Sequence, residues 1–406
     1  MDSNLKMRWT IPFAGFLLAF MGGFSYAWGS FVLPLVSAYN WTTSEATMPF
    51  TVFMVVLALV MFPAGKLQDI FGPRKVSAVG AVLFIVAYGL ASFVARFPYP
   101  WWLITTYGVL GGIACGLTYS CVAPPARKWF PDKPGFAISS AVMGFGLAAV
   151  FAAPLKAEHV IPAFGIDGTL LIIGVATLII SLLASLLIKN PPSGWKPPAL
   201  KANAVKSIKS VHEYTPQELV KSPIFWTSWV TFALVIAGGL MCIPILPAYG
   251  ELIIKLSPIE AAGAIAVFAS FNGFGRPIAG YLSDKFGVVL VMIVTYAIQS
   301  LTLLMFSVFA VNLPTLYISA ALLGWGFAVT LALFPTLTAS CFGAKNLGVN
   351  YGLLFTAFGV GALAPSIGAA IFDATGSYTP AFLTAGIMAT IGLVLCVILK
   401  TKYKLA

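Results

Sequence analysis

The segment GKLQDIFGPRK, from Gly65 to Lys75, lies between two long apolar runs and returns in shorter form as GYLSDKFG, from Gly280 to Gly287. A glycine, an aspartate and a second glycine have the same spacing in both copies, and each equivalent pair is 215 residues apart. The dipeptide Gly72-Pro73 is typical of a turn. One copy would be a weak signal, but two copies in matching positions indicate that the chain consists of two repeated halves.

The chain around the two copies is strongly apolar. Of its 406 residues, 60% are hydrophobic and 9% are charged, whereas an average soluble domain has about 25% charged residues. A helix needs about 20 mostly apolar residues to cross the hydrocarbon core of a bilayer. Twelve runs of this kind lie near residues 11–37, 46–65, 75–95, 101–125, 136–157, 167–188, 224–248, 259–282, 287–310, 314–338, 347–371 and 379–399.

The two copies follow the second and the eighth run, so the runs divide six and six. The sequence predicts an all-α membrane protein with twelve transmembrane helices in two pseudo-symmetric six-helix bundles, residues 1–188 and 224–406. A cytoplasmic linker, residues 189–223, joins the bundles, because this stretch is polar and rich in proline. Within it, Thr215 to Val220 is expected to form a short interfacial helix capped by Thr215. A solvated linker without a docking role is the alternative. The first run is too long for a signal peptide and is read as a retained helix.

The net charge of +11 is distributed unevenly between the loops. If the N-terminus is cytoplasmic, 19 of the 23 lysines and arginines lie in cytoplasmic segments, and only Arg96, Lys156 and Lys255 lie on the outer side. This bias predicts an integral, multi-pass inner-membrane protein with both termini in the cytoplasm. It also argues against a nucleic-acid partner. The five cysteines lie in apolar runs without metal-ligand spacing, so no metal or cofactor is expected.

Arg276 is the remaining cation, and it lies in an otherwise uncharged run, Ala261 to Pro277. An arginine at mid-span is unfavourable by roughly 2.5–3.5 kcal/mol, so it usually faces a wet cavity. Eight residues separate it from Asp284, or ~12 Å along a helix, which places it near the centre of a ~30 Å core. No acidic residue is expected at this depth, which points to an anionic ligand. The alternative is a structural arginine whose N–H groups are satisfied by helix-end carbonyls.

Other polar and aromatic residues are expected at a similar depth. Asn272, one helical turn before Arg276, could bond an oxygen of the ligand or orient the guanidinium. Tyr119 is a candidate hydroxyl donor to a carboxylate, and Tyr26 is a second one beside the Gly22-Gly23 pair. Three phenylalanines could form apolar walls, although aromatic residues at helical spacing are more often packing residues: Phe327, Phe355 and Phe358.

Three further segments carry a family resemblance: GGFSYAW (Gly22 to Trp28), ARKWFPDK (Ala126 to Lys133) and NGFGRP (Asn272 to Pro277). With the repeated loop, they make the chain similar over nearly its whole length to the major facilitator superfamily, in particular to its monocarboxylate transporter and oxalate/formate antiporter group. The resemblance implies the major facilitator fold, and it implies that Arg276 binds the carboxylate of a small substrate such as lactate or pyruvate. It also implies proton coupling.

In the family the repeated loop acts as a cytoplasmic latch. The resemblance therefore implies that Asp69 pairs with a basic residue or a helix N-terminus and favours the outward-facing state. The positions carried over to the latch are Gly65, Asp69, Gly72, Arg74 and Asp284.

The chain departs from the family at informative positions. Many animal members have an aspartate where this chain has Asn272 and a lysine where it has Ser30, and the oxalate antiporter has a second cation where it has Phe358. A second carboxylate would be buried unpaired without that cation. One arginine, whose planar fork can hold a carboxylate bidentately, therefore favours monoacids over oxalate.

The predicted function is a secondary active transporter of small monocarboxylates that works by alternating access as a monomer in the lipid bilayer. The resemblance implies L-lactate or pyruvate as substrates and coupling to protons. An oxalate/formate-type anion exchanger and an anion channel are the alternatives. An enzyme is disfavoured because both histidines lie away from mid-span. The proton is expected to travel on the substrate or on an outer-end acid: Glu251, Glu260 or Asp373.

Overall fold

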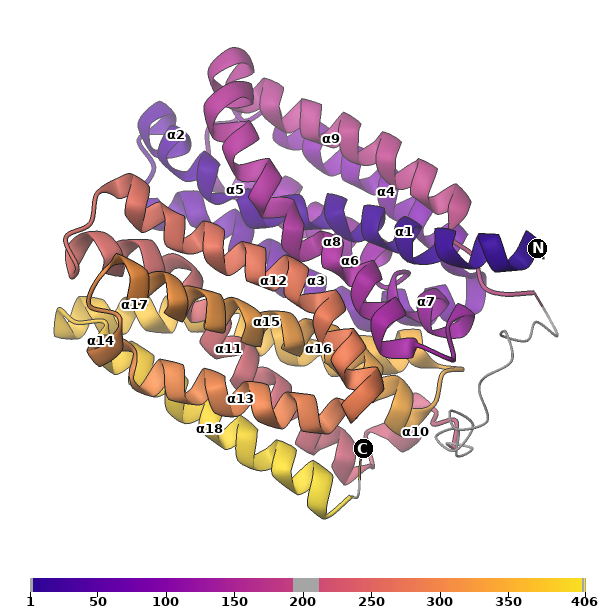
Figure 1. The fold of residues 1–406 in the computed structure, drawn as a ribbon. Coiled ribbons are helices and arrows are strands. Elements are labelled where there is room, and N and C mark those ends of the chain that lie inside the picture. Colours follow the sequence, from indigo (N-terminus) through magenta and orange to yellow (C-terminus); the bar gives the residue numbers. More distant parts are fainter. Residues whose placement is uncertain (1–2, 193–211, 404, 406) are drawn as a thin grey trace.

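The computed structural model describes residues 3–192, 212–403 and 405, and every regular element among them is helical. Nine helical segments of the described chain are long and apolar enough to cross a membrane, and two shorter apolar helices accompany them. The predicted all-α membrane fold is confirmed (Figure 1).

The elements of the two halves have the following bounds. The first half contains α1 (Ser3–Gly23), η1 (Phe24–Ala27), α2 (Gly29–Tyr39), α3 (Thr43–Phe71), α4 (Pro73–Ala91), α5 (Pro100–Leu103), η2 (Ile104–Leu110), α6 (Gly111–Tyr119), α7 (Ala123–Trp129), α8 (Pro134–Pro154), η3 (Leu155–Val160) and α9 (Ile161–Leu187). The second half contains α10 (Pro216–Leu219), α11 (Pro223–Leu252), α12 (Pro258–Phe286), α13 (Val288–Leu304), α14 (Phe306–Phe309), α15 (Leu313–Phe342), α16 (Leu347–Gly361), α17 (Ala364–Thr375) and α18 (Thr379–Thr401).

Several predicted runs are interrupted rather than continuous helices. The first run is divided among α1, the 3₁₀ turn η1 and α2, and the fourth and fifth runs contain the π-helical segments η2 and η3. The first interruption follows Gly23, where a side chain would meet the Phe145 carbonyl and Ala148 of α8. Such irregular turns in otherwise regular helices are frequent at functional sites.

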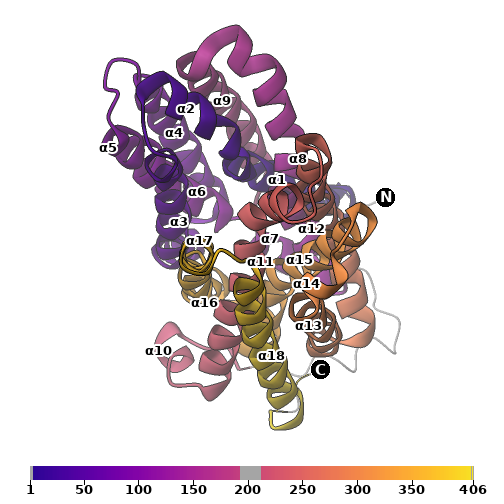
Figure 2. The ribbon, with the colours of Figure 1, turned by 90° about the vertical axis from the view of Figure 1, so that its left-hand side faces the viewer.

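Two pairs of helices join the halves of the molecule. Helix α3 packs along α16, and α8 packs along α12. Viewed along the bundle in Figure 2, the indigo-to-magenta half lies above the orange-to-yellow half. Figure 1 shows both chain termini and α10 at one end of the bundle, on the right, which we call the termini end.

Helix α12 spans the predicted run 259–282 but is not among the nine most apolar segments. The polar side chains of Asn272 and Arg276 in its middle lower its mean hydropathy. The helix therefore carries polar side chains that a purely structural membrane span would lack.

The end of the linker docks on the second half. The predicted short helix is present as α10, and Thr215 caps it by accepting from the Glu218 amide. Just before it, the Tyr214 amide donates to the Phe342 carbonyl at 3.0 Å, and Glu213 accepts from the Lys345 amide at 2.8 Å. A purely solvated linker is thus wrong for residues 213–214. The part of the predicted linker at 193–211 lies outside the described residues.

Arg276 is not the only buried cation of the molecule. Arg8 is buried in an ion pair with Asp132. Lys156, expected in an outer-side segment, is also buried, and its Nζ donates to the Ala27 carbonyl at 2.5 Å. The reason is that η3 continues α8 as a π-helical turn, so Lys156 stays inside the packed bundle.

Candidate functional site

Arg276 lies in the middle of α12 and is 0% exposed. Its Nε and Nη2 donate to the Asn272 side-chain oxygen at 3.3 and 3.1 Å. Its Nη1 donates at 2.6 Å to the carbonyl of Val142, which belongs to α8 in the other half. These bonds occupy three of the five N–H groups of the guanidinium and leave one on each terminal nitrogen. A carboxylate accepts such a pair of donors bidentately.

Two ion pairs are found among the described side chains, Arg8–Asp132 and His212–Glu218, and neither includes Arg276. The positive charge is held by one amide oxygen and one backbone carbonyl. Neutral acceptors orient the guanidinium without cancelling its charge, so the site keeps an attraction for an anion.

The Asn272 oxygen accepts from two nitrogens of Arg276, and this is the contact that an orienting role of Asn272 would use. Gly146 of α8 allows this arrangement. A Cβ at this position would lie 3.2 Å from Arg276 Nε and 3.0 Å from the Cα of Gly273. Gly146 had no signal in the sequence, since its importance comes from how closely α8 and α12 approach each other.

Both predicted tyrosines are near the arginine. Tyr119 ends α6, and its hydroxyl interacts with the Arg276 guanidinium both through charge and as a side-chain hydrogen-bond partner. Tyr26 lies in η1, and its hydroxyl is within electrostatic range of the same guanidinium. Their rings contact the ring of Phe145 at centroid distances of 5.2 and 4.9 Å. The 3₁₀ turn and the end of α6 thus bring two hydroxyls from the first half toward an arginine of the second.

The three predicted phenylalanines separate into two groups. Phe355 and Phe358 of α16 stack with ring centroids 5.0 Å apart, and Phe355 lies 5.9 Å from the Tyr119 ring. Phe327 instead contacts Phe268 at 5.6 Å, and its ring fills the space in front of Gly239. The contacts of Phe327 therefore match the packing alternative. The aromatic wall also includes Tyr351, which sequence reasoning missed and whose ring lies 5.6 Å from that of Phe355.

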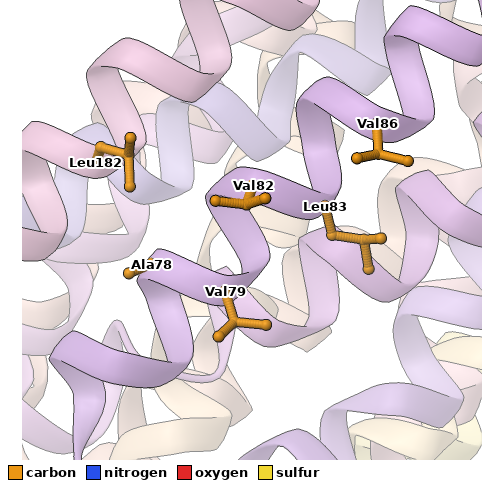
Figure 3. Close-up of a pocket in the computed structure, with 6 residues that line it drawn as sticks. All are labelled: Ala78, Val79, Val82, Leu83, Val86 and Leu182. Carbon is orange, nitrogen blue, oxygen red and sulfur yellow. The ribbon is translucent and has the colours of Figure 1, made fainter.

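A surface hollow between α4 and α9 is separate from these residues (Figure 3). Its lining consists of alkyl side chains: Ala78, Val79, Val82, Leu83, Val86 and Leu182. These side chains offer no polar anchor, so the hollow is a packing irregularity on an apolar face rather than a competing site for an anion.

The first copy of the repeated loop contacts the second half of the molecule at the termini end. The Asp69 carboxylate accepts from the Val349 amide, in the first turn of α16, at 3.0 Å. Gly65, one turn earlier in α3, lies directly against Gly348, and a Cβ on it would overlap the Gly348 carbonyl. Of the two partners expected for Asp69, the structure provides the helix N-terminus, whose partial positive charge attracts a carboxylate.

The second copy of the loop makes the equivalent contact with the first half of the molecule. The Asp284 carboxylate accepts from the Gly135 and Phe136 amides, at the start of α8, at 2.8 and 2.9 Å. Gly280 lies against Gly135 as Gly65 lies against Gly348. Burial raises the pKa of Asp284, and the hydrogen bonds from Phe136 and Gly135 act in the opposite direction. Each half thus holds the first turn of a helix of the other half.

The remaining loop residues shape the turns. Gly72 and its counterpart Gly287 have φ values of 84° and 90°, which residues with a side chain rarely adopt. Arg74 donates to the Leu186 carbonyl near the end of α9. It therefore stabilises the first half internally and does not cross between halves.

Comparisons with known proteins agree with this architecture. Residues 13–281 and 241–405 match the Major Facilitator Superfamily. The oxalate:formate antiporter of Oxalobacter formigenes is 27% identical over 390 residues, which is 94% of this chain and 89% of the antiporter. The uncharacterised MFS-type transporter YhjX of Escherichia coli is 26% identical over 360 residues, 88% of this chain and 86% of YhjX. The crystal structure of the Escherichia coli fucose:proton symporter superposes with a TM-score of 0.70 at 14% identity, covering 95% of this chain and 98% of the symporter.

Proposed function

Because the chain belongs to the major facilitator superfamily, we propose that it is a secondary transporter that carries small monocarboxylates, such as L-lactate or pyruvate, with a proton by alternating access. One observation carries this proposal: a fully buried arginine, in the middle of a helix between the halves, that has no ion pair with a described acid. Most transporters of this build bind their substrate near the membrane midplane between the halves.

The geometry of Arg276 suits one carboxylate. A carboxylate at about 4 Å gains on the order of 4 kcal/mol at an effective dielectric of 20, which offsets much of its desolvation. Asn272 and Val142 hold the guanidinium and leave two N–H groups, which the Tyr119 hydroxyl and the ligand would share. The Phe355–Phe358 stack supplies an apolar surface for the methyl group of lactate.

Alternating access requires the Arg276–Val142 bond to change, because it crosses between the halves. A bound carboxylate can replace the Val142 carbonyl as an acceptor and neutralise the cavity, which frees α8 and α12 to move against each other. The charge bias favours a cytoplasmic position for the termini end. Since Asp69 and Asp284 hold the two halves of the molecule together at that end, we assign the structure to the outward-facing state of the transport cycle.

An oxalate/formate-type exchanger is the second candidate, since the oxalate:formate antiporter is 27% identical over 94% of this chain. Phe358 argues against a dianion, because its ring is buried in the stack with Phe355 where a second cation would be needed.

The test is ligand-induced thermal stabilisation of the purified protein with L-lactate, pyruvate, formate and oxalate. Arg276→Ala should weaken monocarboxylate binding by at least about thirtyfold, because loss of one partner of a buried charge pair costs about 2–5 kcal/mol. Arg276→Lys keeps the charge but loses the fork, so it should also bind more weakly. The control is Arg96→Ala, at an exposed position. Unchanged lactate binding in Arg276→Ala would overturn the assignment, and preferred binding of oxalate would favour the exchanger.

A further inference from the structure

Tyr351 occupies a position between the aromatic wall and the contact of α16 with α3. It lies one helical turn before Phe355 on the same face of α16, and the two rings meet edge to face with centroids 5.6 Å apart. Two residues earlier, the Val349 amide is bound by Asp69. The first turns of α16 therefore carry both a residue of the aromatic wall and the contact at the termini end.

The hydroxyl of Tyr351 is buried without a hydrogen-bond partner among the described residues. The residue as a whole is 3% exposed. Buried polar atoms are nearly always hydrogen-bonded, so an unpartnered one calls for an explanation, of which a bound water or a ligand is one. Tyrosine hydroxyls in particular usually find a partner when buried.

The surroundings of this hydroxyl are rich in donors. It lies within electrostatic range of the Arg276 guanidinium and of the Tyr119 and Tyr26 hydroxyls. The guanidinium can only donate, and the Asn272 and Val142 bonds leave two of its N–H groups to be shared between the Tyr119 hydroxyl and a ligand. An acceptor with several lone pairs is the group that would satisfy these donors together. A carboxylate, with two oxygens and about four acceptor sites, has this property.

We propose that Tyr351 is a further substrate-binding residue, whose hydroxyl donates to the carboxylate held by Arg276. This assignment rests on the proposed function, because it takes the ligand to be a monocarboxylate. The two residues would bind the same carboxylate in different ways. Arg276 supplies the positive charge and two parallel N–H donors, and Tyr351, on α16, donates its hydroxyl hydrogen to a remaining lone pair of the carboxylate. The ligand thereby bridges α12 and α16.

The same assignment links the ligand to the termini end. Tyr351 and Val349 lie in one helical turn of α16, and the Val349 amide donates to Asp69. A hydrogen bond from the Tyr351 hydroxyl to the ligand would therefore shift the same turn that is bound to Asp69. Substrate occupancy and the α3–α16 contact are then coupled through a single short segment of α16.

The experiment compares Tyr351→Phe with the wild-type protein by thermal shift and equilibrium binding. The change removes only the hydroxyl, so affinity for L-lactate should fall about ten- to a hundredfold, as for loss of a hydrogen bond to a charged group. Affinity for propionate, which has no 2-hydroxyl group, should fall by the same factor. The melting temperature without ligand should not fall, since the lost hydroxyl had no partner to lose.

The matched control is Tyr296→Phe. Tyr296 is also a fully buried tyrosine, but it belongs to α13, which packs against α12, α15 and α18 and takes no part in the site. This variant should bind lactate and propionate like the wild type. A change in Tyr296→Phe equal to that in Tyr351→Phe would overturn the specific role of Tyr351.

The outcomes separate the two proposals. If Arg276→Ala abolishes binding but Tyr351→Phe binds lactate within twofold of the wild type, the role of Tyr351 is wrong and the proposed function stands. If Tyr351→Phe weakens lactate but not propionate, the hydroxyl contacts the 2-oxygen, and the carboxylate assignment is wrong. If Arg276→Ala still binds lactate, the proposed function itself fails.

Discussion

Arg276 is oriented before any ligand arrives, and this is unusual for a cation in an apolar core. Its partners are an amide oxygen on its own helix and a backbone carbonyl on the opposite half. These neutral acceptors keep the guanidinium in place, but they do not neutralise its positive charge. A preorganised donor loses less conformational entropy when the ligand binds, so the fixed geometry contributes to affinity.

Gly146 provides the residue-scale test of this preorganisation. In Gly146→Ala the new methyl group would lie 3.2 Å from Arg276 Nε and 3.0 Å from Gly273 Cα, so α8 and α12 must move apart by a few tenths of an ångström. Overpacking of this kind costs typically about 1–3 kcal/mol. We expect a lower melting temperature and several-fold weaker lactate binding.

The control for this change is Gly89→Ala in α4, where a methyl group meets nothing within 4 Å. Replacing a glycine in mid-helix by alanine there should be neutral or stabilising by about 0.5–1 kcal/mol. If Gly146→Ala binds lactate as tightly as Gly89→Ala does, the close approach of α8 and α12 has no role in orienting Arg276.

The sequence made Arg276 and Asn272 visible because a charge and an amide are costly in the middle of an apolar run and are therefore rare there. It could not reveal Gly146, Val142 or Tyr351. A glycine, a valine and a tyrosine are ordinary residues in membrane helices, and their roles arise only when helices far apart in the sequence are brought together. The contact of the Phe327 ring with Phe268 could not be read from the sequence for the same reason.

At the scale of helices, the two copies of the loop form two equivalent contacts. Asp69 accepts from one amide of α16, and Asp284 accepts from two amides of α8. The repeat was readable from the sequence, and the family resemblance implied a basic residue or a helix N-terminus as the partner of Asp69, but only the structure distinguishes between the two. The interruptions in the first, fourth and fifth predicted runs were not readable, because apolar composition does not distinguish α-helical from 3₁₀ or π-helical turns.

Charge-neutral variants test whether these contacts act as a latch. Asp69→Asn and Asp284→Asn keep the side-chain shape but lose the charge that interacts with the helix dipole, worth about 0.3–1 kcal/mol and up to ~2 kcal/mol when partly buried. A change of about 1–2 kcal/mol alters the ratio of two states by about 5–30-fold. We expect lower uptake in proteoliposomes, with expression and lactate affinity broadly intact, and at least as large an effect for Asp284→Asn.

Glu218→Gln is the control for the latch, because Glu218 caps only the short helix α10 of the linker. Its uptake should match that of the wild type. Wild-type uptake by both aspartate variants would exclude a latch function for the repeated loop, whatever its part in folding.

For the whole molecule, the proposed proton coupling requires a group that carries the proton. The structure describes two of the three acids expected as carriers, and the Asp373 side chain lies outside what it describes. Glu251 is exposed at the end of α11. Glu260 is engaged in capping α12, where its carboxylate accepts from the Ser257 amide and hydroxyl at 3.0 and 2.6 Å. Neither of these two acids is an internal carrier next to Arg276, which supports the proposal that the proton travels on the substrate.

Charge movement distinguishes a proton symporter from a carrier of the bare anion. In the proposed mechanism, lactate bound to Arg276 gives a neutral cavity. If no proton accompanies lactate, each transport cycle moves one negative charge across the membrane, and a membrane potential changes the free energy of that movement by about 2.3 kcal/mol per 100 mV. We expect uptake into proteoliposomes to be accelerated by an inside-alkaline gradient and to be insensitive to a potential set independently by potassium and an ionophore. Counterflow against preloaded unlabelled lactate should accelerate labelled uptake, which a channel would not do. Uptake that ignores the pH gradient and is slowed by an inside-negative potential would show that the anion moves alone.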